Sequence, residues 1–181
     1  MTDPGSSPPP SGIRQRVIVA LVAAATLAAD QGAKAWALSA LPGRGPVRLL
    51  GDFLSLRLLR NSGAAFSIGS DVTWILTMLA AGAVVGIAWF AARVRSSGWA
   101  VALGLMLGGA GTHLLDRLFR APGFGIGHVV DFIDYNGWFV GNVADIALTV
   151  GAGLAVLLSA LGIGMDGQRR SWRPEGGTPE P

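Results

Sequence analysis

Two aspartates in the last third of the sequence lie in apolar surroundings, where a lone carboxylate is costly. Asp131 falls within the apolar segment 129–133, and Asp145 stands near the start of a long apolar run. Between them, Asn136 and Gly137 form a dipeptide typical of a turn that reverses the chain. If this turn brings the two carboxyl groups together, one can accept a proton from water while the other, protonated, polarises a scissile carbonyl. The spacing therefore allows an aspartate pair that activates one water molecule.

Asp145 also has a purely structural explanation. Asn142 is suited to cap the helix that starts with the apolar run, and the positive end of the helix dipole favours an acidic residue in the first turn. The same dipole favours the ionised form of Asp145, whereas the apolar neighbours of Asp131 favour its protonated form. We therefore expect Asp145 to act as the base and Asp131 as the acid.

The other ionisable residues of the apolar segments form two clusters. Asp30 and Lys34 are four residues apart and can form an ion pair on one helix face. His113, Asp116 and Arg117 share a face by the same spacing. His113 either bonds Asp116 or donates to the substrate or the aspartate pair, and Arg117 is either structural or holds a polar part of a substrate. Because a charge at membrane depth costs at least about 2.5 kcal/mol, such groups are usually paired or functional.

Metal and thiol chemistry find little support in the sequence. The chain has no cysteine and two histidines, His113 and His128. A catalytic zinc site usually takes about three protein ligands. The sequence therefore offers no thiol nucleophile, and a zinc site would have to use carboxylates as most of its ligands.

The elements that must position these side chains are membrane-spanning helices. Of the 181 residues, 51% are hydrophobic and 14% are charged, and the mean hydropathy is +0.50, whereas soluble domains have about 25% charged residues. Glycines at positions 104, 108 and 111, with Gly109 beside them, are expected to let another helix approach closely. The sequence predicts an all-α membrane protein with four transmembrane helices and a small extracytoplasmic β-rich loop domain. A span takes about 20 apolar residues, and the expected spans are 17–41, 73–92, 99–119 and 143–163.

Loops and polar ends complete the predicted organisation. The four-span domain covers residues 17–163, between a disordered cytoplasmic N-terminus (1–16) and a disordered cytoplasmic tail (164–181). The outer loops cover about 42–71 and 120–142, and alternating polarity at 54–58 predicts a strand. Arginines cluster in the two ends and the short middle loop, which places both termini in the cytoplasm. The net charge of +3 then reflects membrane topology rather than nucleic-acid binding. The first span also resembles a cleavable signal peptide, but we expect it to be retained because it gives an even number of spans.

Five short blocks occur in order, at consistent places relative to the four spans. They resemble the motifs D-Q-x-x-K, N-x-G-x-A-F, G-G-A-x-G-N-x-x-D-R, V-x-D-F and F-N-x-A-D of lipoprotein signal peptidases, also called signal peptidase II. The resemblance covers roughly residues 17–163, about four fifths of the chain. Each block alone is weak, but five in order are specific. The blocks lie at 30–34, 61–66, 108–117, 129–132 and 141–145.

This resemblance implies an intramembrane aspartyl endopeptidase of a bacterial cell membrane. The implied reaction removes the signal peptide from a diacylglyceryl-modified prolipoprotein, just before the lipidated cysteine, without metal or organic cofactor. The implied partners are prolipoproteins and membrane lipid, with no nucleic acid, and we expect a monomer with its site near the outer face. The implied catalytic residues are Asp131 and Asp145. The residues implied to line or support the site are Asn61, Gly63, Asp116, Arg117, Asn142, His113, Asp30 and Lys34.

The sequence departs from the family pattern at four positions. Thr112 stands where the family has glycine, and His113 stands where it has asparagine. Phe139 and Gly141 replace the usual proline and phenylalanine. Because both aspartates are intact, we expect catalysis to survive and substrate or inhibitor fit to change.

Two other function classes remain open. A catalytically inactive lipoprotein-binding relative is supported only by the changes at positions 112 and 113. A small four-span transporter would carry polar groups through the full depth of the membrane, whereas the inner halves of these spans are almost wholly apolar. A cleavage assay on a lipidated prolipoprotein distinguishes the three.

Overall fold

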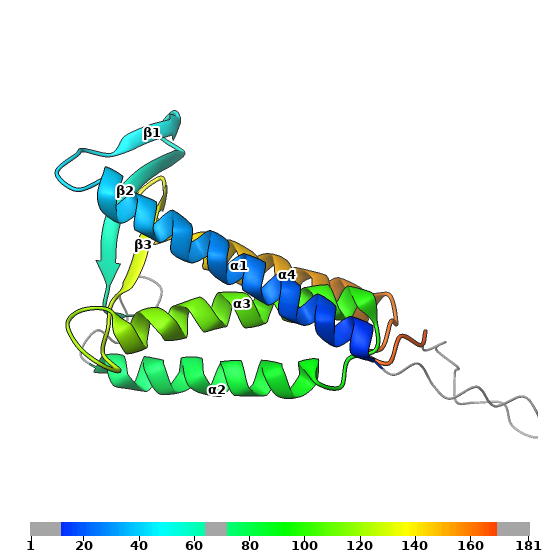
Figure 1. Cartoon of the computed structure of the whole chain (residues 1–181). Coiled ribbons are helices and arrows are strands. Elements are labelled where there is room, and N and C mark those ends of the chain that lie inside the picture. Colours follow the sequence, from blue (N-terminus) through cyan, green and yellow to red (C-terminus); the bar gives the residue numbers. More distant parts are fainter. Residues whose placement is uncertain (1–11, 64–71, 170–181) are drawn as a thin grey trace, which may run out of the picture.

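The four predicted membrane-spanning helices are present in a computed structural model, which describes residues 12–63 and 72–169. Each is long and apolar enough to cross a membrane. They lie alongside one another, with a small sheet at one end of the bundle (Figure 1). The helices are α1 (Ile13–Ala40), α2 (Thr73–Ala91), α3 (Ser97–Phe119) and α4 (Val143–Ala160).

The first helix begins earlier than the hydropathy pattern predicts. α1 starts at Ile13, so residues 13–16 are helical instead of belonging to a disordered end. The charges of Arg14 and Arg16 lower the local hydropathy, but long arginine side chains can reach polar headgroups while their helix continues. Residues 1–11, the rest of the predicted disordered end, lie outside the described residues.

The fourth helix ends before the apolar run of residues ends. Gly162 adopts a φ of 70°, in the left-handed region that glycine favours. The N–H groups of Gly162 and Ile163 donate to the carbonyls of Ser159 and Leu158, which is the Schellman arrangement that closes a helix. The span predicted for 143–163 therefore ends at Ala160.

The segment after α4 is ordered as far as the structure describes it. The carbonyl of Met165 accepts hydrogen bonds from the N–H groups of Arg95 and Ser96, at 2.8 and 3.0 Å. These contacts fix residues 164–169 beside the α2–α3 connection, where the sequence analysis predicts disorder. The rest of the predicted disordered tail, 170–181, lies outside the described residues.

α3 is the central helix and packs against the other three. Its glycines make this possible: a Cβ added at Gly108 would lie 2.6 Å from the Cβ of Thr26 in α1. One added at Gly109 would lie 2.7 Å from the Cγ of Leu148 in α4. The predicted close helix approach is confirmed at both positions, and also at Gly104, where an added Cβ would lie 2.8 Å from the Cβ of Val22. It is not found at Gly111, where the Cδ1 of Leu27 would lie 4.0 Å away. α1 and α4 thus each pack closely against α3, and they also contact each other.

A four-stranded antiparallel sheet joins the two predicted outer loops, in the order β1-β2-β3-β4. The strand predicted at 54–58 is confirmed as part of β2. β3 and β4 do not show in the sequence pattern, because β3 is largely buried along its length and lacks an alternation of polarity. The predicted turn is present, with φ of 55° at Asn136 and 75° at Gly137. The strands are β1 (Val47–Leu50), β2 (Leu54–Asn61), β3 (Val129–Tyr135) and β4 (Phe139–Gly141).

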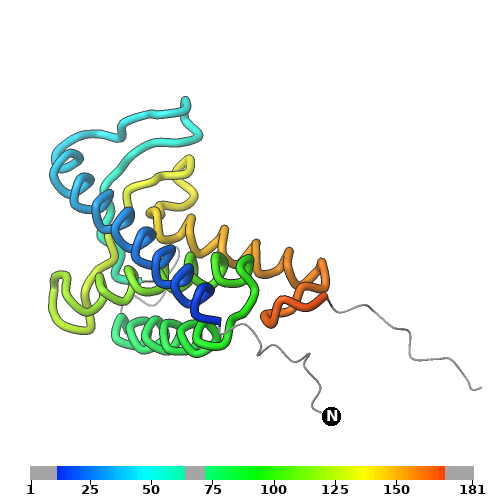
Figure 2. The backbone as a smooth tube through the Cα atoms, turned by 45° about the vertical axis from the view of Figure 1, so that its right-hand side comes forward, coloured from blue at the N-terminus to red at the C-terminus, as the bar shows by residue number. Residues whose placement is uncertain are grey.

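The sheet and the described chain ends lie at opposite ends of the bundle. The start of α1 and the segment after α4 come together at one end, and the strands lie at the other (Figure 2). At the sheet end, α1 and α3 finish and α4 begins (Figure 1). β3 contacts both α1 and α3 there. The two predicted outer loops, which supply Asn61 and Asp131, therefore meet the ends of three helices.

Candidate active site

Asp131 lies in the middle of β3, and two amides hold its carboxyl group. Asn61 at the end of β2 donates from Nδ2 to Oδ2 at 3.0 Å, and Asn142 donates from Nδ2 to Oδ1 at 2.6 Å. The residue is 3% exposed. Burial raises the pKa of Asp131 to about 6, and the nearby Asp145 adds to this rise, whereas both amides oppose it. Burial therefore favours the protonated form of Asp131, which is the form that a general acid needs.

Asn142 also caps α4 and thereby positions Asp145. Its side-chain oxygen accepts from the N–H of Asp145 at 3.2 Å, and its own N–H donates to Asp145 Oδ2 at 2.8 Å. This is a capping box, with the carboxylate in the first turn of the helix. From the sequence alone, Asn142 and Asp145 either cap the helix or form part of a site. The structure combines the two roles: the side-chain oxygen of Asn142 caps α4, and its side-chain nitrogen donates to Asp131.

The two aspartates open onto one cavity of about 240 Å³. Asp131 enters it from β3 and Asp145 from the first turn of α4. Leu76 and Ala80 of α2 supply apolar lining to the same cavity. The turn predicted between the aspartates thus brings them to a common space. The other predicted site residues that line this cavity are Asn61, Gly63, His113 and Arg117.

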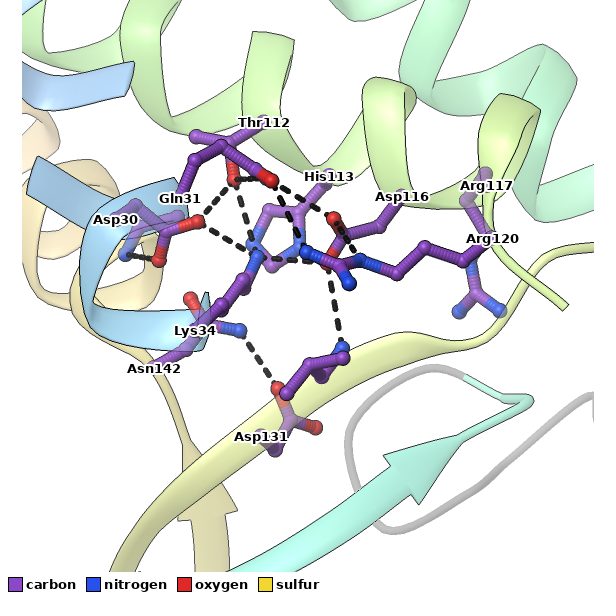
Figure 3. A network of polar contacts seen from close by, with 12 residues as sticks. Asp30, Gln31, Lys34, Thr112, His113, Asp116, Arg117, Arg120, Asp131 and Asn142 are labelled. Atoms are coloured by element: carbon purple, nitrogen blue, oxygen red, sulfur yellow. Dashed lines mark hydrogen bonds and ion pairs between the residues drawn. The ribbon is translucent and has the colours of Figure 1, made fainter. Parts of the chain in front are cut away.

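A buried ion network lies beside this cavity (Figure 3). Lys34 Nζ is 2.6 Å from Asp30 and 2.8 Å from Asp116, and none of the three side chains is more than 1% exposed. Arg120 Nε lies 2.6 Å from Asp116 Oδ1. Thr112 accepts from Lys34 at 3.1 Å and donates to Asp30. Two positive and two negative groups balance, which satisfies charges that would otherwise be strongly unfavourable inside the protein.

The network reaches the backbone next to both aspartates. Asp116 Oδ2 accepts from the N–H of Val130 at 3.2 Å, one residue before Asp131. Asp30 Oδ1 accepts from the N–H of Ala144 at 2.9 Å, one residue before Asp145. The predicted ion pair of Asp30 with Lys34 is confirmed, and its effect is to fix β3 and the start of α4 on α1 and α3.

Arg117 holds the chain around the site by donating to backbone carbonyls. Its guanidinium bonds the carbonyls of Ser62 at 2.9 Å and Gly127 at 3.2 Å, and also those of Asn61 and Gly63. The side chain is 5% exposed. These contacts support the structural explanation of Arg117: it ties the end of β2 to the residues just before β3.

His113 contacts Asp145 instead of Asp116. Its Nε2 lies 3.1 Å from Asp145 Oδ1, and within residues 12–63 and 72–169 His113 forms no hydrogen bond or ion pair with Asp116. The alternative in which the ring only bonds Asp116 is therefore wrong. One oxygen of Asp145 faces the imidazole and the other faces the Asn142 N–H.

Three members of the ion network are not among the predicted site residues. Thr112 shows in the sequence only as a departure from the family pattern, and its hydroxyl bridges the ion pair. Gln31 donates to Asp116 at 3.0 Å and accepts from Arg120 at 3.0 Å. The four-residue spacing of Asp116 and Arg120 is a usable signal, but Arg120 lies beyond the predicted span.

Metal binding has no visible basis in the described residues, where no three His, Asp or Glu side chains form a suitable group.

The second sequence block extends to residue 66, and its residues 64–66 lie outside the described part. The asparagine and the glycine that this motif specifies, Asn61 and Gly63, line the cavity as expected. All ten predicted site residues thus fall at the cavity or in the polar contacts that surround it.

Comparison with known proteins gives a consistent result. Residues 22–161 match the family model described as signal peptidase (SPase) II. The chain is 46% identical over 171 residues to a lipoprotein signal peptidase of Rhodococcus jostii, covering 93% of this chain and 86% of the relative. It is 47% identical over 165 residues to one of Mycobacterium avium, covering 91% and 88%. A bacterial membrane enzyme solved by the in meso method at 2.3 Å matches with a TM-score of 0.68 and 26% identity, covering 78% of this chain and 87% of that one.

Proposed function

The chain belongs to the signal peptidase II family of proteases, and we propose that it cleaves diacylglyceryl-modified prolipoproteins just before the lipidated cysteine. The observation that carries the proposal is the pair Asp131 and Asp145, which share one cavity and are linked by Asn142. We assign the reaction to a water molecule activated between them.

The proposed reaction uses the two carboxyl groups in different protonation states. Asp145, in the first turn of α4, accepts a proton from water as the water oxygen attacks the scissile carbonyl carbon. Asp131 starts protonated and gives its proton to the carbonyl oxygen, which forms a tetrahedral diol. As this intermediate collapses, the C–N bond breaks and the proton held by Asp145 passes to the leaving amine of the lipidated cysteine. One hydroxyl of the diol returns its proton to Asp131 as the new carboxyl group forms, so both aspartates regain their starting protonation states. The raised pKa of Asp131 supports this assignment.

His113 is proposed to position the base. With its Nε2 3.1 Å from Asp145 Oδ1, a ring that is protonated at this nitrogen donates to the carboxylate and fixes its orientation. An amide at this position can donate in the same way. Histidine in place of the family's asparagine is therefore compatible with an active enzyme. Thr112, which stands in place of the family's glycine, is also compatible, because its hydroxyl takes part in the ion network.

We further propose that the site faces the outer side of the membrane. It lies at the sheet end, and both described chain ends lie at the other end (Figure 2). The arginine bias of the short segments favours cytoplasmic termini, so the sheet end is outside. Leu76 and Ala80 of α2 form an apolar wall of the cavity, which suits a signal peptide that enters sideways from the bilayer.

A cleavage assay tests the proposed function. The purified full chain is incubated with a prolipoprotein that carries diacylglyceryl on its cysteine, and with the same prolipoprotein without the lipid. We expect mass spectrometry to find a new N-terminus at the cysteine of the lipidated substrate alone. Cleavage at another bond, or equal cleavage of both substrates, would contradict the proposed specificity. No cleavage by the wild-type chain would favour the inactive relative.

A further inference from the structure

A second cavity, of about 320 Å³, lies beside the sheet and contains three basic side chains. Arg60 comes from β2, Arg120 directly follows α3, and His128 directly precedes β3. Leu38 of α1 and Phe119 of α3 supply an apolar part of the lining. None of the described residues that line it is acidic.

This cavity is separate from the one that holds the aspartates. Arg60 pairs with Val130 in the β2–β3 register, and both line the basic cavity. The next residues along the strands, Asn61 and Asp131, line the aspartate cavity. Because successive side chains of a strand point to opposite faces, the β2–β3 pair separates the two cavities.

The basic groups retain unused hydrogen-bond donors. In the described part of the chain, neither the Arg60 side chain nor the His128 ring forms an ion pair or hydrogen bond. Arg120 uses Nε for Asp116 and one Nη2 hydrogen for Gln31, and a guanidinium has five N–H donors in all. The carboxylate of Asp116 is 1% exposed and already shared with Lys34. An incoming anion would therefore meet free donors and positive charge.

The position of the cavity matches the level of lipid headgroups. Phe119 is the last residue of α3, and Leu38 lies in the last turn of α1, so the cavity stands where two membrane-spanning helices end. Phe119 is 71% exposed. A cavity lined by both basic and apolar side chains fits a molecule with a phosphate at one end and hydrocarbon at the other. Guanidinium groups bind phosphate oxygens well.

We propose that this cavity binds the phosphate of an anionic phospholipid. Arg60, Arg120 and His128 contact the phosphate oxygens, and the upper part of an acyl chain lies against Leu38 and Phe119. The site does not depend on the proposed cleavage reaction. It requires only that the helices span a membrane.

Lipid binding to the purified full chain tests this site. Native mass spectrometry in neutral detergent measures the apparent Kd for phosphatidylglycerol and for phosphatidylcholine, whose phosphate is compensated by a cation. We expect the wild-type chain to bind phosphatidylglycerol more tightly than phosphatidylcholine. In Arg60→Gln, we expect the Kd for phosphatidylglycerol to be about tenfold larger, equivalent to about 1.4 kcal/mol. Arg44→Gln is the matched control, because Arg44 is exposed in the loop after α1 and does not line the cavity. We expect its Kd to be unchanged.

Two results would overturn the proposal. Equal loss of affinity in Arg60→Gln and Arg44→Gln would show attraction by overall charge and no specific site. Displacement of the lipid by millimolar inorganic phosphate, with Arg60-dependent binding of phosphate alone, would identify a free-phosphate site instead. If Arg60→Gln does not yield folded protein, His128→Gln tests the same cavity, with the same expected loss and the same control.

Discussion

Asp30 and Asp116 share the ammonium group of Lys34, and each accepts a backbone hydrogen bond from the residue just before one of the two proposed catalytic aspartates. Ala144 N–H binds Asp30, and Val130 N–H binds Asp116. A buried ion network on α1 and α3 thereby sets the relative position of α4 and β3. The proposed active site depends on this network although none of its charges enters the reaction.

Removal of the Lys34 charge, at the centre of the ion network, is expected to destabilise the protein strongly. Lys34→Met leaves Asp30 and Asp116 buried with a single remaining cation, Arg120, and breaking a buried ion pair costs about 3–5 kcal/mol. We expect a large loss of thermal stability in detergent, together with loss of cleavage. Arg48→Met is the control, because Arg48 pairs with Asp52 at 3.4 Å with both side chains largely exposed, and such pairs contribute about 0–1 kcal/mol. Equal stability of the two variants would contradict the supporting role.

Substitutions at His113 test the contact with Asp145. His113→Asn keeps a donor and is expected to retain most activity. His113→Ala leaves Asp145 Oδ1 without that partner and is expected to lose about 1–3 kcal/mol of interaction, which lowers kcat/KM by about 5- to 160-fold. If alanine and histidine give the same rates from pH 5 to 8, the contact has no role in the reaction.

The pH dependence of cleavage tests the protonation state of Asp131. Burial raises the pKa of Asp131 to about 6, and the proposed reaction needs this carboxyl group protonated. Activity is therefore present below this pKa and is lost as the pH rises through it, so kcat/KM should fall with an apparent pKa near 6. A positive charge on His113 lowers the pKa of Asp131, so His113→Asn should move the fall to higher pH. A rate that is constant from pH 5 to 8 would be inconsistent with Asp131 as the acid.

Close packing of α3 against α4 is expected to matter for the site as well as for the fold. A Cβ at Gly109 would lie 2.9 Å from the carbonyl oxygen of Ala144, one residue before Asp145. Gly109→Ala should separate the helices and destabilise the protein by about 1–3 kcal/mol, with reduced cleavage. Gly82→Ala is the matched control in α2, where nothing lies within 4 Å of the added carbon. The melting temperature in detergent and the cleavage rate are measured for both variants. Equal melting temperatures and equal rates would show that the close approach of α3 to α4 is not needed.

Much of this arrangement can be predicted from the sequence, because it follows from local patterns. Long apolar runs identify the spans, and the four-residue spacing of Asp30 and Lys34 predicts their ion pair. Asn136 and Gly137 predict the turn that brings Asp131 toward Asp145.

Features that depend on tertiary contacts are harder to predict. β3 is largely buried, so its sequence lacks the alternation of a half-exposed strand. The double role of Asn142 depends on β3 passing beside the start of α4. Thr112 and Arg120 have partners about 80 to 90 residues away in the sequence, and no spacing rule of a single sequence reveals contacts of that length.

The most direct test of the central claim compares aspartate-to-asparagine substitutions in one cleavage assay. Asp131→Asn and Asp145→Asn keep the shape of each side chain but remove its acid–base function, which contributes about 10²–10⁴-fold in rate. The control is Asp52→Asn, whose carboxylate is 80% exposed and pairs only loosely with Arg48. We predict that both site variants accumulate in the membrane as the wild type does and cleave lipidated prolipoprotein at least about a hundredfold more slowly, while Asp52→Asn cleaves normally. Activity above about half of the wild-type rate in either site variant would contradict the assignment of this aspartate pair.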